Sequence, residues 1–134
     1  MGTSWSAHIV DPPAGCAAEI EAVLARIIAQ MSNWEPDSAI SRFNRAPIGT
    51  WMPLPADMLT VLRAGLEMAR LSDGAFDPAI GHQVDRWGFG PAILPRPDDA
   101  PSTPPWQAIE IDGDQARRLA PVALDFSGIA KGFA

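Results

Sequence analysis

The chain has 134 residues, of which 47% are hydrophobic and 19% charged, so it can bury one modest core and is not expected to be disordered. Its net charge of −6 argues against nucleic acid as a partner, because phosphate backbones require basic faces. No stretch approaches the ~18 apolar residues of a membrane span, and none has the charged-then-apolar order of a signal peptide. Cys16 is the only cysteine, so the chain cannot form an internal disulfide.

The first third of the chain predicts one strand and one helix. Loose alternation of apolar and polar residues over Thr3–Val10 predicts a half-buried strand, which Pro12 and Pro13 end. Apolar residues then recur at three- and four-residue spacing over Ala14–Ser32, which predicts an amphipathic helix. The stretch 33–53 is predicted to be irregular, apart from a short capped turn over Asp37–Phe43.

The middle of the chain predicts a second long helix and a shorter one. Pro55 stands where a helix can begin, an apolar stripe follows, and Gly74 ends it. Ala79–Trp87 predicts a short third helix, and the proline-rich segment 91–105 predicts a surface loop.

Strand signals dominate the last third. Asp112-Gly113-Asp114 stands between two short strand patterns over 108–119, which predicts a hairpin, and a final short strand is predicted over Val122–Asp125. We therefore expect an α+β fold, with helices packed on one face of a mainly antiparallel sheet. The chain ends three residues after Lys131, and we expect these residues to be the first part of a larger single domain.

A candidate anion site lies at the end of the sequence. Ser127-Gly128 follows the last predicted strand and predicts a helix start, where outward backbone N–H groups favour anions. Lys131, one turn later, adds a positive charge, so the site suits a phosphate or pyrophosphate. Elsewhere simpler interpretations are favoured. Trp34 can stack on a flat ligand, but the simpler interpretation is that it covers the core; Arg42 can meet a phosphate, but a lone surface arginine is usually solvated. Asp77 belongs to a turn, and His82 has no catalytic role.

Four segments in order resemble the flavin transferase family that is often labelled as thiamine-biosynthesis lipoproteins. They are Met-Gly-Thr-Ser-Trp at 1–5, Met-Ser-Asn-Trp-Glu-Pro-Asp-Ser at 31–38 with Ser-Arg-Phe-Asn at 41–44, Asp-Gly-Ala-Phe-Asp-Pro at 73–78 with Trp-Gly-Phe-Gly at 87–90, and Leu-Asp-Phe-Ser-Gly-Ile-Ala-Lys-Gly at 124–132.

The resemblance implies an enzyme that splits FAD and, with Mg²⁺, transfers FMN to a Ser or Thr hydroxyl of an acceptor flavoprotein, releasing AMP. It implies that Gly128 offers a backbone carbonyl to the metal, and that seven residues contact FAD: Met1, Trp34, Ala75, Phe76, Asp77, Asp125 and Lys131.

Family members are about twice as long, so the resemblance places the catalytic residues beyond Ala134, and no catalytic base is assigned here. We expect these 134 residues to bind FAD weakly and to transfer nothing.

Two other functions remain open: a flavin-binding module without transferase activity, and an FAD diphosphatase that releases FMN. The resemblance suggests an acceptor in a membrane redox complex of the sodium-pumping quinone reductase or Rnf type. It also suggests a periplasmic or cell-envelope location, with the cytoplasm as the alternative because the sequence shows no leader.

Overall fold

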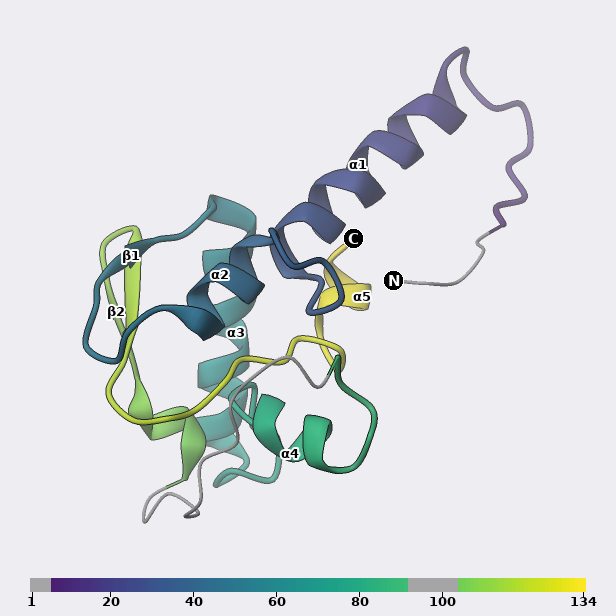
Figure 1. Cartoon of the computed structure of the whole chain (residues 1–134). Coiled ribbons are helices and arrows are strands. Elements are labelled where there is room, and N and C mark those ends of the chain that lie inside the picture. The colour runs from purple at the N-terminus through teal and green to yellow at the C-terminus, as the bar shows by residue number, and fades with distance from the viewer. Residues whose placement is uncertain (1–5, 92–103) are drawn as a thin grey trace.

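The computed structural model describes residues 6–91 and 104–134, and it combines helices with one small antiparallel sheet (Figure 1). The elements in chain order are α1 (Cys16–Met31), α2 (Ala39–Arg45), β1 (Met52–Pro53), α3 (Ala56–Leu71), α4 (Gly81–Arg86), the 3-10 turn η1 (Pro105–Ala108), β2 (Ile109–Asp112), β3 (Gln115–Arg118) and α5 (Ala130–Phe133). The expected α+β class is confirmed.

The sheet is built around the predicted hairpin, with strand order β1-β3-β2 and both pairs antiparallel. Ile109 lies opposite Arg118 and Asp112 opposite Gln115, and Gly113 takes a positive φ of 56° in the connecting turn. Strand β1 falls in the stretch predicted to be irregular, because two residues are too few for alternation to be visible.

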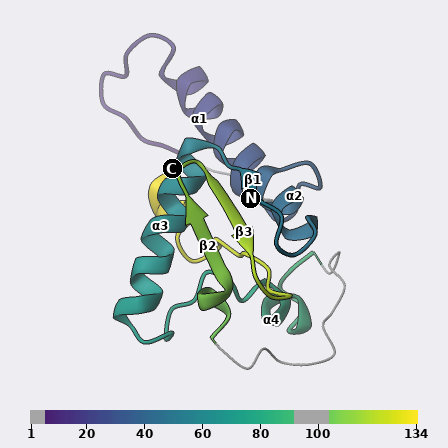
Figure 2. The ribbon, with the colours of Figure 1, turned by 90° about the vertical axis from the view of Figure 1, so that its left-hand side faces the viewer.

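Helix α3 supplies the largest share of the core. Its buried stripe includes Met58, Val61, Leu62 and Ala69, as the spacing predicts. The helix follows Pro55, and the chain turns after it at Gly74, whose N–H donates to the Ala69 carbonyl at 2.8 Å. Figure 2 shows α3 running along the sheet, and its buried residues share one hydrophobic cluster with the strands.

Helix α1 forms as predicted but extends away from the rest of the molecule (Figure 1). Of its apolar stripe only Ile27 and Met31, near the C-terminal end of the helix, are buried. The helix therefore joins the core by one end, and it delivers residues 32–38 to the centre of the molecule.

Two predicted strands are wrong in the described residues. Residues 6–10 are exposed and form no strand, with Val10 90% exposed, because alternation in a sequence does not supply a partner strand; residues 1–5 lie outside the described part. The predicted strand Val122–Asp125 is reduced to one parallel bridge between Ala123 and Ile80.

The remaining predictions of the middle region need small corrections. The third helix is confirmed but is shorter than expected, because α4 begins at Gly81 and ends at Arg86. The turn predicted over Asp37–Phe43 is a full helix, α2, that runs to Arg45. Most of the proline-rich segment, 92–103, lies outside the described residues, and Pro105 begins η1.

In the part of the chain that the structure describes, no helix combines the length and apolarity needed to cross a membrane.

Gly81 marks the closest backbone contact between α4 and the segment after β3. Its N–H donates to the Ala123 carbonyl at 2.8 Å, and a Cβ at this position would lie 2.9 Å from both the Cβ and the carbonyl oxygen of Ala123. We predict that Gly81→Ala lowers the free energy of unfolding by about 1 to 3 kcal/mol, because the backbone itself must shift.

The measurement is urea unfolding, with Gly132→Ala as the matched control. Gly132 lies in α5 with open space around its Cα, so its substitution should be neutral or slightly stabilising. Equal effects of the two substitutions would contradict the close contact at Gly81.

Candidate functional site

Polar side chains of α2 hold the turn that follows α1. The hydroxyl of Ser38 caps the helix by accepting from the Ser41 N–H at 3.1 Å, and it donates to the Ser32 carbonyl at 2.7 Å. The Ser41 hydroxyl donates to the Asn33 carbonyl at 3.4 Å. Residues 32–38 are thereby fixed to the helix on which they fold back.

Two arginines of α2 hold the outer part of the same turn. Arg42 donates to the Asp37 carbonyl and Arg45 to the Pro36 carbonyl. The sequence left Arg42 as a candidate for phosphate binding or for a solvated surface position, and the structure shows it bound to the backbone.

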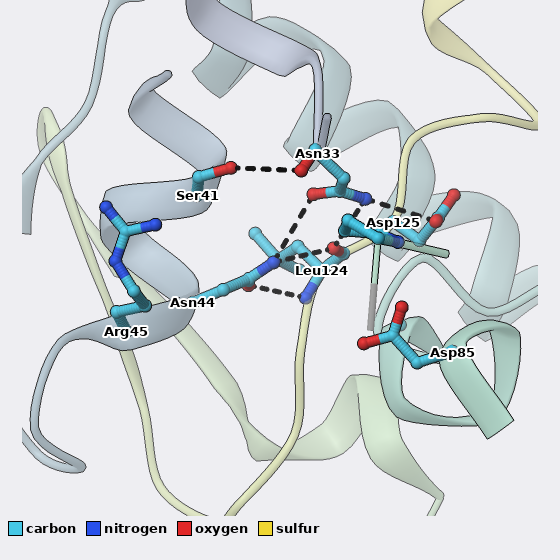
Figure 3. Close-up of a pocket in the computed structure, with 9 residues that line it drawn as sticks. Asn33, Ser41, Asn44, Arg45, Asp85, Leu124 and Asp125 are labelled. Atoms are coloured by element: carbon cyan, nitrogen blue, oxygen red, sulfur yellow. Dashed lines mark hydrogen bonds between the residues drawn. The ribbon is translucent and has the colours of Figure 1, made fainter. Parts of the chain in front are cut away.

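Asn44 of α2 binds the backbone of a distant segment. The Leu124 N–H donates to Asn44 Oδ1 at 2.8 Å, and Asn44 Nδ2 donates to the Leu124 carbonyl at 2.9 Å (Figure 3). Both residues are buried, so the amide replaces the partner strand that this segment lacks. The buried backbone groups of Leu124 are satisfied in this way.

Asn33 extends this pairing to Asp125. Its Nδ2 donates to the Leu124 carbonyl at 3.3 Å and to Asp125 Oδ2 at 3.1 Å (Figure 3). Asp125 Oδ1 accepts from the Ser127 N–H at 2.8 Å, and the Asp125 N–H donates to the Pro78 carbonyl at 2.8 Å. The Asp125 carboxylate is therefore held at both oxygens.

A hollow of about 530 Å³ opens between the turn after α1 and the segment that leads into α5. Trp34 stands on one side with 61% of its surface exposed, exposed Lys131 lines the other, and buried Phe126 contributes to the wall. The volume lies within the range of small-molecule sites. The remaining lining residues are Met31, Ser32, Asn33, Glu35, Ser127 and Ala130.

A much smaller polar pocket adjoins the hollow through Asn33. Asp85 and Asp125 line it together with Asn44 and Arg45, and its volume of about 20 Å³ suits a water molecule rather than a cofactor (Figure 3).

The segment 75–78 lies against the end of the chain. A Cβ on Gly128 would lie 3.4 Å from the ring of Phe76, so the two residues are in close contact. Asp77 accepts from the N–H groups of Ala79 at 2.7 Å and Trp106 at 3.1 Å. Burial raises the pKa of Asp77, and these two hydrogen bonds act in the opposite direction.

The predicted helix start at the end of the chain is wrong in detail. Ser127-Gly128 forms a turn, and α5 begins only at Ala130 and spans four residues. The N–H groups of Ile129 and Ala130 donate to the Phe126 carbonyl, at 3.0 and 2.8 Å. Fewer backbone donors therefore face a ligand than expected, and the charge of Lys131 carries more of the anion preference.

The structure brings most of the candidate residues together. Trp34 and Lys131 line the same hollow, Asp125 and Gly128 flank Phe126 and Ser127 in its wall, and Phe76 touches Gly128. Exposed Ala75 and hydrogen-bonded Asp77 belong to the adjoining segment but do not line the hollow, and Met1 lies outside the described residues. Among the described residues, no group of three or more His, Cys, Asp and Glu side chains could hold a metal.

Sequence reasoning missed Asn33 and Asn44. The available signal was the three-residue spacing of Ser38, Ser41 and Asn44, which places three polar side chains on one face of a helix. This face is polar but buried. Its sequence pattern is therefore neither the apolar stripe of a helix that packs on a core nor the charged pattern of a helix face in solvent.

The model of the ApbE family matches residues 1–134, the whole chain. The chain belongs to the ApbE family. It is 32% identical to the FAD:protein FMN transferase of Haemophilus influenzae and 31% identical to that of Vibrio cholerae, with 99% of this chain and 44% of each relative covered. The chain thus spans less than half the length of these curated relatives.

Solved structures of ApbE proteins share the fold. The apo form of the Pseudomonas stutzeri flavinyl transferase ApbE superposes with a TM-score of 0.75 at 33% identity, covering 87% of this chain and 42% of that one. The flavin transferase ApbE of Vibrio cholerae gives 0.76 at 31% identity, covering 87% and 40%. The described architecture is therefore that of the N-terminal part of an ApbE domain.

Ala134 is the last residue of the sequence and caps α5 without contributing to the site. It is exposed, its N–H donates to the Ala130 carbonyl at 3.3 Å, and it does not line the hollow. The family resemblance implies that the catalytic residues lie beyond Ala134, and their location stays a prediction.

The pairing of Asn44 with Leu124 predicts a large effect on stability. Asn44→Ala leaves the buried N–H and carbonyl of Leu124 without this partner, which should lower the free energy of unfolding by about 2 to 4 kcal/mol. Chemical denaturation measures the change. Ser41→Ala is the control, because it removes only bonds of 3.4 and 3.5 Å and should cost less than about 1 kcal/mol.

His82 of α4 predicts a pH dependence of stability. Burial lowers its pKa, as do the charges of Arg118 and Arg86, while Asp85 acts in the opposite direction. The unfolded chain then binds the proton at a higher pH than the folded chain, so stability falls as the pH drops below about 6.5, the ordinary value for histidine.

The test compares urea midpoints at pH 7.5 and 5.5 for the wild-type chain and for His82→Gln. The glutamine variant should lose less stability on acidification than the wild type. An identical loss in both proteins would exclude His82 as the group responsible.

Proposed function

We propose that this chain forms the FAD-binding part of a Mg²⁺-dependent transferase that moves FMN from FAD to a Ser or Thr hydroxyl of an acceptor flavoprotein. One observation carries the proposal: Trp34 and Lys131, nearly a hundred residues apart in sequence, line one hollow in a chain of the ApbE family. The relatives named FAD:protein FMN transferase support the same activity.

The two sides of the hollow suit the two halves of a flavin nucleotide. The exposed ring of Trp34 offers a flat apolar face on which an isoalloxazine ring can stack. Lys131 is the only lysine in a chain of net charge −6, and it can meet the pyrophosphate. Phe76 touches Gly128, which follows Ser127 of the wall of the hollow. We infer that Ala75, Phe76 and Asp77 contact the rest of FAD, and we keep Met1 as a further contact.

The proposed reaction breaks the phosphoanhydride bond between the FMN and AMP moieties of FAD and forms a phosphoester bond between FMN and the acceptor. The acceptor hydroxyl oxygen attacks the phosphorus of the FMN moiety, the bond from that phosphorus to the bridging oxygen breaks, and AMP leaves with that oxygen. The hydroxyl proton passes to a base. In such a reaction positioning and charge stabilisation supply most of the acceleration.

The described residues fit a magnesium ion only in part. The Gly128 carbonyl lies on an exposed turn and is an oxygen ligand of the kind that Mg²⁺ prefers, but the described residues hold no acidic cluster to complete a site. When bound, Mg²⁺ would neutralise charge on the pyrophosphate. We place the other metal ligands and the base beyond the position of Ala134, in the portion of family members that this chain does not cover.

One alternative has an observation in its favour. The chain covers 44% of its relatives and the described residues have no acidic metal cluster, so these 134 residues can act as an FAD-binding module without transfer. The second alternative, an FAD diphosphatase, differs only in using water in place of the acceptor hydroxyl. From the resemblance we place the acceptor in a membrane redox complex and the reaction in the periplasm or cell envelope.

Intact-mass spectrometry of an acceptor domain tests the reaction. The acceptor is incubated with FAD, Mg²⁺ and this chain, and the Vibrio cholerae transferase serves as the positive control. We expect FMN to be added in the control and the acceptor to stay unmodified with these 134 residues. Free FMN with this chain would favour the diphosphatase, and efficient transfer by it would show that no further segment is required.

The binding surface makes a separate prediction. Trp34→Ala should weaken FAD binding by up to about tenfold, because a stacked aromatic contributes roughly 0.5 to 1.5 kcal/mol beyond its buried area. Flavin fluorescence measures the affinity. Trp87→Ala is the matched control, since Trp87 is 74% exposed but does not line the hollow, and it should leave the affinity unchanged. Equal affinities in the Trp34→Ala variant and the wild type would contradict stacking.

A further inference from the structure

We propose that Asn33 is a positioning residue for the reaction: its side-chain amide sets the orientation of the Asp125 carboxylate beside the hollow lined by Trp34 and Lys131. Asn33 lines both the hollow and the small polar pocket next to it, so it stands between them. The inference rests on the proposed function, because the orientation of Asp125 affects catalysis only if FAD binds in the hollow.

The backbone of Leu124 determines which side-chain atoms donate and which accept in this series of hydrogen bonds. A backbone N–H can only donate, so the atom of Asn44 that it reaches at 2.8 Å is the oxygen. The nitrogen of Asn44 therefore faces the Leu124 carbonyl, at 2.9 Å, and also Asn33 Oδ1, at 3.5 Å. Asn44 is fixed by the main chain and cannot turn over without breaking both bonds.

The orientation of Asn33 follows from that of Asn44. With its Oδ1 toward the nitrogen of Asn44, its Nδ2 points to two acceptors, the Leu124 carbonyl at 3.3 Å and Asp125 Oδ2 at 3.1 Å. Figure 3 shows the two amides in sequence between α2 and Asp125. The backbone of Leu124 thus sets which group donates to the carboxylate.

Asp125 retains capacity for a ligand after these contacts. A carboxylate has about four acceptor positions, and Asn33 and the Ser127 N–H occupy one on each oxygen. The Asp125 N–H is held by the Pro78 carbonyl, so the backbone is fixed as well. A carboxylate that is free to rotate loses conformational entropy when it binds a ligand. The Asp125 carboxylate is already ordered by its hydrogen bonds, so this entropic cost of binding is lower.

Asparagine is the residue that this position requires. Aspartate has the same shape, but when ionised it cannot donate, and it would place a second negative charge about 3 Å from Asp125. Asn33→Asp therefore removes the donor and opposes the carboxylate, while Asn33→Ala removes the whole side-chain amide without adding a charge.

The experiment measures FAD affinity of the 134-residue chain by flavin fluorescence for the wild type, Asn33→Ala, Asn33→Asp, Asp125→Asn and the double variant Asn33→Asp/Asp125→Asn. We expect Asn33→Ala to weaken binding several-fold and Asn33→Asp about tenfold or more, as for the loss of a hydrogen bond to a charged group. In the Asp125→Asn background, Asn33→Asp should cause no further loss, because Asn33 acts through Asp125. Equal losses in both backgrounds would overturn the proposal.

A pH comparison separates positioning from a merely structural role. The Asn33→Asp variant should regain affinity, relative to the wild type, as the pH is lowered toward 4, because a protonated carboxyl can donate where the amide did. Asn33→Ala should show no such recovery. A constant deficit of the Asn33→Asp variant at all pH values would count against positioning of Asp125.

If the chain fails to bind FAD, that result counts against the proposed function alone. A measurement without FAD then still tests the positioning role of Asn33. In the NMR spectrum of the free chain, the side-chain amide proton of Asn33 that is donated to Asp125 should exchange slowly and shift downfield, and Asp125→Ala should abolish both features for this proton, while the proton donated to the Leu124 carbonyl keeps its partner. Fast exchange and shifts typical of a free asparagine in the wild type would overturn the positioning role.

Discussion

The pairing of Asn44 with both backbone groups of Leu124 is the contact on which the site depends. The segment after β3 enters the core with Val122, Ala123 and Leu124 fully buried, yet only Ala123 makes a strand-like bridge. Buried peptide groups without partners would cost several kcal/mol. One side chain from α2 supplies the missing donor and acceptor, and Asp125 and Phe126 follow in positions that this contact determines.

Helix α2 consequently holds both walls of the hollow. Its first turn binds the backbone of residues 32–38, which carry Trp34, and its last turn binds Leu124, from which the chain continues to Lys131. Two segments about 90 residues apart are thus fixed to one helix of seven residues. A ligand that contacts both walls binds to groups whose separation is already set, and this lowers the entropic cost of binding.

The sequence predicts the long helices and the hairpin well because each has a strong local signal. The stripes of α1 and α3 repeat at helical spacing, and Asp112-Gly113 identifies the turn between β2 and β3. The predicted strands at Thr3–Val10 and Val122–Asp125 are wrong in the described residues. A strand forms only where it pairs with a partner strand, and alternation of apolar and polar residues does not reveal that partner. The family resemblance named Trp34 and Lys131, but their shared hollow, and the roles of Asn33 and Asn44, required the fold.

Chemical modification of Lys131 tests the central claim, that the hollow between Trp34 and Lys131 accepts FAD. Lys131 is the only lysine, so acetylation at this position can be followed by peptide mass spectrometry apart from the N-terminal amine. We expect saturating FAD to slow acetylation of Lys131, and Trp34→Ala, which weakens binding, to reduce this protection at a fixed FAD concentration. Acetylation of Lys131 at an unchanged rate while FAD is bound would place the nucleotide elsewhere and contradict the account.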